Sequence, residues 1–278
     1  NITFNAERAI IEMGDRTQGR SLFNVNMAKR FVQTFLIATG CKELLDIGKT
    51  TSIRDLYYMT KHTIGRTSEN TFDGQEESDP VIEDLEVTVG ALREELNLFA
   101  SNRGSMVGEI TFVDAGDTID ARRQGSGGWA IPSIVEDSVI QFKKVDAKFI
   151  LLVEKDAVWR RLNEDRFWKE HQCILVQSNG QPARGVRRLL RRMHDELKLP
   201  LYVLVDNDPW GLYIYSVLKQ GSINLAYESV RMAIPKARFI GLSSFDREKF
   251  DLPDGSTIIL NGKDEARAKQ MMKYPWFQ

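Results

Sequence analysis

The stretch LYVLVDNDPWG, residues 201–211, decides the fold, because its apolar run ends in two carboxylates beside a proline and a glycine. The segment FILLVEKD, residues 149–156, follows the same pattern and reaches an acid at Glu154. Apolar, partly β-branched runs of this length predict buried strands of a parallel sheet. Ligands of open α/β sheets bind just outside the carboxyl ends of the strands. We therefore expect Glu154, Asp206 and Asp208 to meet at one edge of the sheet.

Three carboxylates at such an edge are typical of a site for a hard divalent cation, most often Mg²⁺. This ion takes one or two carboxylates, keeps several waters and completes its shell with substrate phosphates. The alternative is that each acid caps the helix that follows it, a position where Asp is favoured. Because the acids follow successive strands, the pattern favours the metal site, and with it metal-assisted phosphate chemistry.

The chain divides by pattern into a helical first part and an α/β second part. In the second part, strands alternate with helices, which predicts βαβ units. Expected helices cover 157–170, 183–198 and 210–222, and further strands cover 173–180, 237–243 and 256–262. The first part predicts helices over 26–48, with Gly40 as a stop, then over 50–63 and 81–99, and short hairpin strands or wings over 104–132. The expected domains are residues 1–145 and 146–278.

Composition limits the classes of protein that remain. A length of 278 residues suggests two domains, and a net charge of -1 means that any DNA-binding surface must be a local patch. The two cysteines are far apart and lack zinc-ligand spacing, which favours a reducing compartment. No apolar run is long enough to predict a membrane span, and no signal peptide is visible. The chain begins without Met, which suggests a fragment or an incomplete amino terminus.

The pair Tyr57 and Tyr58 is a second candidate for chemistry. A tyrosine on a DNA-facing helix can attack a phosphodiester and form a covalent phosphotyrosine link. Arg54 lies one helical turn before Tyr58, where it could stabilise developing phosphate charge. Taken alone, two adjacent tyrosines are more often core residues of an amphipathic helix, so the motif is weak without further support.

A basic cluster is the third candidate. Its spacing puts several guanidinium groups on one helix face, suited to a phosphate backbone, and its members are Arg184, Arg187, Arg188, Arg191 and Arg192. A solvated helix face is an equally good interpretation. The segment GDRTQGRS, residues 14–21, approximates a phosphate-binding loop, but Arg20 stands where lysine belongs and no βαβ unit surrounds it. We therefore predict no nucleotide cofactor site.

In their order, these parts resemble the catalytic A subunit of type IIB DNA topoisomerases, the topoisomerase VI family, which shares its core with the meiotic double-strand-break protein. The resemblance covers nearly the whole chain. It is strongest in IRDLYYM (53–59), FILLVEKDAVWRRL (149–162), SNGQPARGVRRLL (178–190) and VDNDPWGLYIYSVLKQGSINLAYES (205–229). The acidic signature is that of a Toprim domain, which other enzymes share. A tyrosine helix that precedes the Toprim domain fits only the topoisomerase VI group among those considered.

The resemblance implies a fold and a set of roles. The fold would be α/β, with an amino-terminal winged-helix domain before a Toprim domain with a Rossmann-like parallel sheet. Tyr58 matches the family nucleophile, with Arg54 beside it, and Glu154, Asp206 and Asp208 match the acids that bind Mg²⁺. Two A subunits would form a homodimer on double-stranded DNA, with the tyrosine of one protomer serving the acids of the other. Each protomer would cut one strand, and a second duplex would pass before religation.

The family also implies partners and a compartment. ATP would be hydrolysed by a separate GHKL-type B subunit, in a heterotetramer of two A and two B subunits, without a membrane. An archaeal source would mean a nucleoid-associated protein of the cytoplasm, and a eukaryotic source a nuclear one. From the resemblance we expect that the family's amino-terminal extension is missing or cut short in this sequence, and that related sequences continue beyond the final YPWFQ into another helix. Both departures leave the catalytic residues untouched and bear on binding of the B subunit.

Three other functions remain open at the level of sequence. The same residues would serve a meiotic-type protein that makes breaks without resealing them. A Toprim nuclease or primase would use the acids without a covalent intermediate. A DNA-binding module would use them only as structure.

Overall fold

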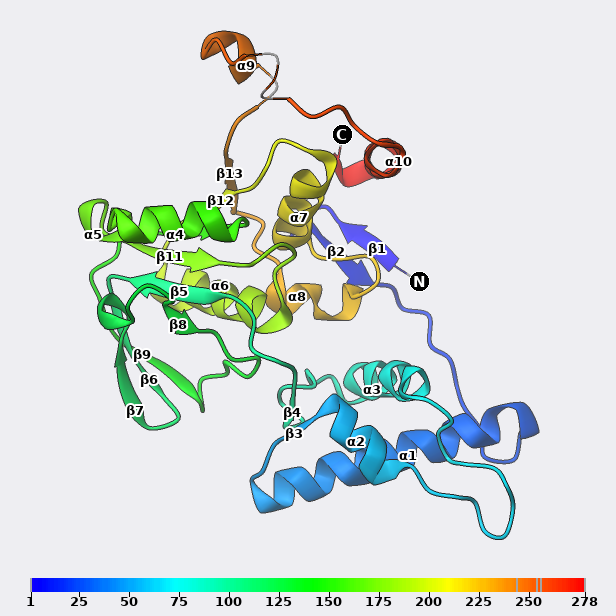
Figure 1. Cartoon of the computed structure of the whole chain (residues 1–278). Coiled ribbons are helices and arrows are strands. Elements are labelled where there is room, and N and C mark those ends of the chain that lie inside the picture. The colour runs from blue at the N-terminus through cyan, green and yellow to red at the C-terminus, as the bar shows by residue number, and fades with distance from the viewer. Residues whose placement is uncertain (1, 244, 254, 256, 278) are drawn as a thin grey trace. The chain divides into compact units, whose positions relative to one another are not determined.

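The computed structural model describes residues 2–243, 245–253, 255 and 257–277, and it separates into two compact units. One unit comprises Asn1–Gly14 and Asn102–Gln278, and the other comprises Asp15–Ser101. Figure 1 shows a sheet with helices on its faces in the first unit and mainly helices in the second. Within the described ranges, no helix is both long and apolar enough to cross a bilayer.

The unit of residues 15–101 is a small helical domain with an apolar core of its own. Its elements are α1 (Val25–Ile47), β3 (Thr51–Ser52), α2 (Ile53–Thr60), α3 (Gln75–Val89) and β4 (Leu98–Phe99). Each helix contributes to one buried cluster, for example Ile37 from α1, Leu56 from α2 and Ile82 from α3. The side chains of this cluster hold the short helix α2 in place against two longer neighbours.

Helix α1 confirms the helix predicted over residues 26–48, but the predicted stop at Gly40 is wrong. The helix continues to Ile47, and Gly48, with a φ of 62°, provides the left-handed C-cap. Gly40 is buried, and a Cβ at this position would lie 2.7 Å from Leu56 Cδ1. Its small size therefore lets α2, which carries both tyrosines, pack closely on α1.

Helix α3 differs from the helix predicted over residues 81–99. It begins earlier, at Gln75, contains Pro80, and ends at Val89 before a left-handed Gly90. The prediction began after the proline because residues 65–80 are polar and have the composition of a loop. It ran too far because the apolar spacing continues beyond the glycine that ends the helix.

The other unit is built on a sheet whose strands follow the order β13-β12-β10-β11-β5-β8. Neighbouring strands are parallel from β13 to β11 and antiparallel from β11 to β8. The strands are β5 (Ser105–Gly108), β8 (Trp129–Ala130), β10 (Phe149–Val153), β11 (Cys173–Gln177), β12 (Leu201–Leu204) and β13 (Arg238–Ile240). The helices are α4 (Asp156–Glu164), α5 (Phe167–Glu170), α6 (Arg184–Leu197), α7 (Pro209–Gln220), α8 (Ser229–Met232), α9 (Asp246–Lys249) and α10 (Gly262–Met271). The predicted α/β class with a parallel sheet is confirmed.

Both faces of this sheet are covered, as the apolar strands require. Successive residues of a strand point to opposite faces. Ile150 and Leu152 of β10 belong to a cluster that includes the apolar side of α6, whereas Leu151 and Val153 pack in another cluster with Trp159 of α4. The sheet is therefore the middle layer, and the helices of each βαβ crossover hide its apolar side chains from water.

The hairpin strands predicted over residues 104–132 are present, but they belong to the sheet-containing unit. Strands β6 (Ile110–Asp114), β7 (Asp117–Asp120) and β9 (Ile140–Val145) form a separate antiparallel sheet, and β5 pairs with β11. The compact units therefore divide between residues 101 and 102, whereas the sequence placed the boundary between 145 and 146. A hairpin of β1 (Ile2–Asn5) and β2 (Ile10–Met13) also belongs to this unit.

The carboxyl-terminal segments agree with the sequence in part. The strand predicted over residues 237–243 is present as β13. The strand predicted over 256–262 is wrong for the part that is described, because residues 257–261 are irregular and Gly262 begins α10. Ser256 lies outside the described residues. Short 3-10 helices are η1 (Ala121–Arg123), η2 (Ala226–Glu228) and η4 (Pro275–Phe277).

Candidate active site

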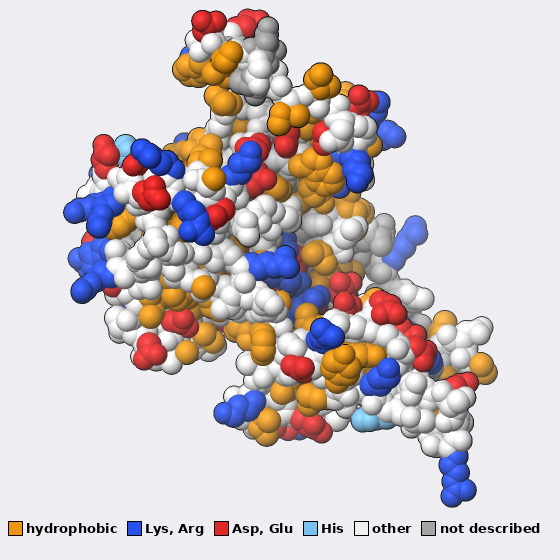
Figure 2. All heavy atoms as spheres, viewed as in Figure 1, with side chains coloured by type: hydrophobic (Ala, Val, Ile, Leu, Met, Phe, Trp, Pro, Cys, Tyr) orange, Lys and Arg blue, Asp and Glu red, His pale blue; other side chains and the backbone are white. Residues whose placement is uncertain are grey.

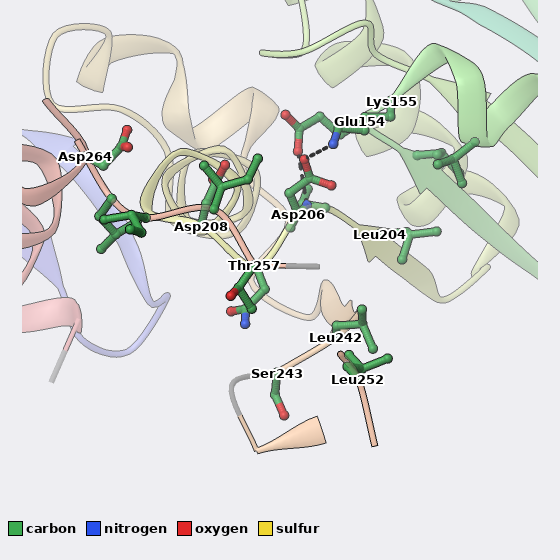
Figure 3. A pocket seen from close by; sticks show the side chains of 17 residues that line it. Glu154, Lys155, Leu204, Asp206, Asp208, Leu242, Ser243, Leu252, Thr257 and Asp264 are labelled. Carbon is green, nitrogen blue, oxygen red and sulfur yellow. Dashed lines mark hydrogen bonds and ion pairs between the residues drawn. The ribbon is translucent and has the colours of Figure 1, made fainter. Parts of the chain in front are cut away.

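The three predicted acids line one pocket at the carboxyl edge of the parallel strands. Strands β10 and β12 pair in parallel, with Val153 opposite Leu204, and the Glu154 N–H donates to the Leu204 carbonyl at 3.0 Å. Glu154 and Asp206 therefore emerge from neighbouring strand ends. The pocket has a volume of about 640 Å³, and Asp208 also lines it. Figure 3 shows the acids together with apolar side chains that complete the wall.

Glu154 and Asp206 are linked directly. The Asp206 backbone N–H donates to Glu154 Oε2 at 3.4 Å, which orients the Glu154 carboxylate toward the end of β12. Partial burial raises the pKa of the Glu154 carboxyl above its ordinary value, and repulsion from Asp206 and Asp208 adds to this increase. A carboxylate that is disfavoured for these reasons is stabilised by a cation placed beside it.

Asp208 has a structural role in addition to lining the pocket. It is the N-cap of α7, and its Oδ1 accepts the Gly211 N–H at 2.7 Å. Pro209 begins the helix, a position that proline favours. The helix-capping interpretation is therefore correct for Asp208. Only one carboxylate oxygen of Asp208 accepts this bond. The residue can therefore cap α7 and at the same time contribute its negative charge to the pocket.

Gly211 fixes the distance between α7 and the end of β12. A Cβ on this glycine would lie 2.3 Å from the Asp206 carbonyl oxygen. A contact that short with backbone cannot be relieved by turning a side chain, so only glycine fits. Gly211 thus allows the first turn of α7 to pack directly on the backbone of Asp206, one of the pocket acids.

Lys155 is a pocket residue that the sequence patterns did not single out. Its Nζ forms an ion pair with Asp206 Oδ2 and lies at the acidic end of the pocket (Figure 3). The hydrogen bond to Asp206 raises the pKa of the Lys155 ammonium, and the charges of Asp206, Glu154 and Asp208 add to this effect. The signal available from sequence was its place directly after Glu154, at the start of α4.

The donor chemistry of the pocket fits Mg²⁺. Within the described ranges, no three His, Cys, Asp or Glu side chains stand close enough together to hold one metal ion. The adjacent Glu154 and Asp206 nevertheless offer hard oxygen ligands, and Mg²⁺ in proteins needs only one or two carboxylates with waters and substrate phosphates. An ammonium group already pairs with Asp206, so this edge of the pocket attracts a cation.

The two tyrosines of α2 face different environments. Tyr58 is 57% exposed, whereas Tyr57 is 6% exposed and packs in the core of the helical unit. Arg54 Nη2 donates to the Tyr58 hydroxyl at 3.4 Å, and its guanidinium carbon lies 5.9 Å from the Tyr58 ring centroid. Lys61 Nζ donates to the Tyr57 hydroxyl at 3.0 Å. The core interpretation of the pair is therefore correct for Tyr57, and Tyr58 is presented to solvent with a guanidinium at its hydroxyl.

The predicted basic face of α6 is turned largely into the protein. Glu228 is fully buried, and its carboxylate forms ion pairs with both Arg184 and Arg187, the second of which is only 4% exposed. A buried carboxylate needs such partners, because an unpaired charge in the interior is costly. The phosphate-binding interpretation therefore does not fit Arg187, and Arg184 has the same acidic partner.

The remaining arginines of this helix are also engaged within the protein. Arg188 holds Glu136 through two bonds, from Nε at 2.8 Å and from Nη2 at 2.6 Å. Arg191 donates to the Ala233 carbonyl, and Arg192 is buried against the carbonyls of residues 135 and 140. These contacts bind α6 to the segments that surround it. The structure therefore gives these arginines a structural role within the protein, in place of the predicted DNA-facing cluster on α6.

Exposed basic side chains of this unit lie elsewhere. Figure 2 shows lysine and arginine side chains gathered over α4 and α5, and this group comprises Arg160, Arg161, Arg166 and Lys169. Two of them pair with acids of the same segment, Arg160 with Asp156 and Arg161 with Asp165. Their exposure makes them suitable controls for the buried arginines of α6.

We expect Arg187→Ala to lower the free energy of unfolding by about 3–5 kcal/mol, because buried Glu228 loses one of its cations. Urea unfolding followed by circular dichroism measures this change. DNA affinity of the fraction that remains folded should be unchanged. Arg160→Ala, which removes an exposed guanidinium, is the matched control and should leave stability nearly unaltered. Weaker DNA binding at unchanged stability would instead restore the phosphate-binding role of Arg187.

Comparison with known proteins places both units in one family. Residues 149–278 match the Toprim domain of the family formed by the topoisomerase 6 A subunit/Spo11, and residues 29–98 match the family "Type IIB DNA topoisomerase". The A subunit of type 2 DNA topoisomerase 6 from Pyrococcus abyssi is 43% identical, over 100% of this chain and 75% of that protein. Its counterpart from Aeropyrum pernix is 42% identical, over 99% of this chain and 75% of that protein. The A3 subunit of DNA topoisomerase 6 from Oryza sativa subsp. indica is 36% identical, over 93% of this chain and 56% of that protein.

These similarities agree with the order of the parts along the chain. The match to the type IIB topoisomerase family contains α2 with Tyr58, and the match to the Toprim domain contains Glu154, Asp206 and Asp208. The identities of 43% and 42% to the two archaeal proteins extend over essentially the whole sequence. The chain therefore belongs to the family of topoisomerase 6 A subunits, within the type IIB DNA topoisomerases.

Proposed function

We propose that this chain is the DNA-cleaving subunit of an ATP-dependent type II topoisomerase, with Tyr58 as its nucleophile. The observation that carries the proposal is the convergence of Glu154, Asp206 and Asp208 on one pocket at the carboxyl edge of the sheet. The exposed hydroxyl of Tyr58, with Arg54 beside it, supplies the second element that a transesterification needs. Family membership supports duplex DNA as the substrate.

The chemistry would be an exchange of phosphate esters. The Tyr58 hydroxyl oxygen attacks the phosphorus of a DNA phosphodiester, the bond from phosphorus to the 3′ oxygen breaks, and a 5′-phosphotyrosine ester forms. The phenol gives up its proton to solvent, and the departing 3′ oxygen takes one. Because one ester replaces another, the reverse reaction can reseal the strand. Arg54 would stabilise the negative charge that develops near the hydroxyl.

The pocket acids would serve this exchange by holding a cation. Glu154 and Asp206 would bind Mg²⁺ directly, and Asp208 would bind it through one of the waters that this ion keeps. The positive charge of the ion would offset that of the scissile phosphate. The raised pKa of Glu154 supports this assignment, because a carboxylate whose charged form is disfavoured gains from a cation beside it. Asp208 would contribute while it still caps α7.

The complete enzyme would contain more than this chain. Two copies would form a homodimer on duplex DNA, with the tyrosine of one protomer acting with the acids of the other. A GHKL-type B subunit would supply the ATPase, in a heterotetramer of two A and two B subunits. This arrangement would let each protomer cut one strand, so that a second duplex passes through a double-strand break.

The experiment is a cleavage assay on supercoiled plasmid with ATP, Mg²⁺ and the B subunit. We expect covalent protein–DNA adducts and relaxed product, both of which disappear when EDTA removes Mg²⁺. Asp208→Asn is the sharpest variant, because Asn caps helices as well as Asp does and α7 should stay intact. Loss of a carboxylate ligand should lower cleavage by about 100-fold, while DNA binding persists. Unaltered cleavage by Asp208→Asn would reject its assignment as a metal ligand.

The products separate the other functions. Cleavage without any adduct would indicate a Toprim nuclease, and adducts that are never resealed would indicate a protein that only makes breaks. DNA binding without either product would leave only a binding module.

A further inference from the structure

We propose that Lys155 is a tethered counter-charge, which neutralises Asp206 while the pocket holds no metal and leaves this carboxylate when Mg²⁺ binds. Lys155 would thereby set the affinity of the site for divalent cations. The proposal rests on the proposed metal site and adds a residue that acts on it from within the same chain.

Both the backbone and the side chain of Lys155 place this residue at the pocket. Its backbone follows Glu154 directly and has extended geometry, with φ of −84° and ψ of 125°, as the N-cap residue of α4. The Glu154 N–H is bonded to β12, so the root of the lysine side chain is fixed beside the acids. Its Nζ pairs with Asp206 Oδ2, and Figure 3 shows this contact at the Glu154 end of the pocket. The side chain is therefore anchored at its base and attached to a candidate ligand at its tip.

The ion pair is placed where a divalent cation can displace it. The Lys155 side chain is 58% exposed and that of Asp206 is 39% exposed, so both groups keep contact with water. Exposed pairs of this kind contribute little free energy. A cation of twice the charge attracts the same carboxylates more strongly. Lys155 can then swing away on its flexible stem without exposing a buried charge.

The three carboxylates of the pocket explain why a positively charged side chain at this position stabilises the metal-free protein. Glu154, Asp206 and Asp208 lie close enough for each of them to act on the Lys155 ammonium. Without a counter-charge, three carboxylates at one edge would repel one another. Lys155 holds this group together in the free protein, and after displacement its ammonium remains available for a phosphate oxygen of DNA.

The test is a titration with Mn²⁺, which substitutes for Mg²⁺ and whose free form is counted by electron paramagnetic resonance. The variants are Lys155→Met, which removes the charge at similar length, and Lys155→Arg, which keeps the charge. Lys169→Met is the matched control, because it removes an exposed lysine of the same unit that does not line the pocket. We expect Lys155→Met to bind Mn²⁺ roughly 5- to 10-fold more tightly than the wild type. Lys155→Arg and Lys169→Met should bind like the wild type.

The outcomes separate this proposal from the proposed function. Equal or weaker binding by Lys155→Met, with a wild type that does bind, overturns the role of Lys155 and leaves the metal site standing. Absence of Mn²⁺ binding in every protein overturns the metal site and the Lys155 proposal together. A gain in affinity that Lys169→Met shares also overturns it, because the effect then reflects net charge. Lys155→Gln, tested in parallel, should behave like Lys155→Met and guards against a folding defect in one variant.

Discussion

The Tyr58→Phe variant should form no covalent adduct with DNA, with a loss of cleavage on the order of 10⁶-fold, as is typical when a nucleophile is removed. The change deletes one hydroxyl from a side chain that is 57% exposed, so the free energy of unfolding should change by less than about 0.5 kcal/mol. DNA binding and Mg²⁺ binding should persist. The measurement is the yield of protein-linked DNA after denaturation with detergent.

Tyr57→Phe provides a control from the preceding residue of the same helix. Its hydroxyl accepts a hydrogen bond from Lys61, so its removal should cost about 1 kcal/mol of stability. Adduct formation should nevertheless survive, because Tyr57 lies in the core of the helical unit. If the adduct is lost in Tyr57→Phe and kept in Tyr58→Phe, the assignment of the nucleophile must be exchanged between the two tyrosines.

Mixed dimers of Tyr58→Phe and Asp208→Asn should cleave a single strand, although Tyr58→Phe alone is inactive and Asp208→Asn alone is strongly impaired. In the proposed homodimer, the tyrosine of one protomer acts with the acids of the other. The intact tyrosine of the Asp208→Asn protomer would therefore meet the intact acids of the Tyr58→Phe protomer. The yield of adduct should be about half that of the wild-type dimer, since a two-fold symmetric enzyme retains one of its sites.

The mixed dimer also has an outcome that contradicts the proposal. If each protomer used its own acids, neither site of the mixed dimer would be complete, and the adduct would not exceed the low yield of Asp208→Asn alone. Two different affinity tags allow purification of the mixed species, and nicked plasmid reports the cleavage of one strand. The wild-type chain mixed with Tyr58→Phe is the control, because it retains one complete site under either arrangement.

Much of the acidic pocket was predictable because it depends on local pattern. The apolar runs before Glu154 and Asp206 form β10 and β12, and parallel pairing brings the two strand ends together. The proline and glycine after Asp208 mark the start of α7, where the carboxylate caps the helix. The chemistry of Lys155 was missed because its neighbour Asp206 lies far along the chain, beyond the end of a different strand, β12.

The role of the α6 arginines was not predictable, because it depends on distant partners. The spacing that puts arginines on one face is the same whether that face meets DNA or a buried acid. Glu228 and Glu136 lie 41 and 52 residues from Arg187 and Arg188, respectively, outside any helical or hairpin period. Only the folded chain shows that these acids meet the helix.

The extent of the compact units and of the strands also depends on pairing between distant segments. Strand β5 is four residues long, and its antiparallel pairing with β11 joins residues 102–145 to the sheet-containing unit. The apolar run that ends at Leu260 has the composition of a buried strand, yet Ile258 and Ile259 are 94% and 93% exposed. Local composition shows that a strand is possible, but a neighbouring strand must be present for one to form.

The close approach at Gly211 has a consequence for how the acidic edge can move. A Cβ at position 211 would lie only 2.3 Å from the Asp206 carbonyl oxygen. The first turn of α7 therefore packs directly on the backbone at the end of β12, and neither segment can move toward the other. Asp208, which caps that same turn, is carried along with it. Any hinge motion of this unit must therefore bend elsewhere, and Asp206 and Asp208 move together as one rigid piece.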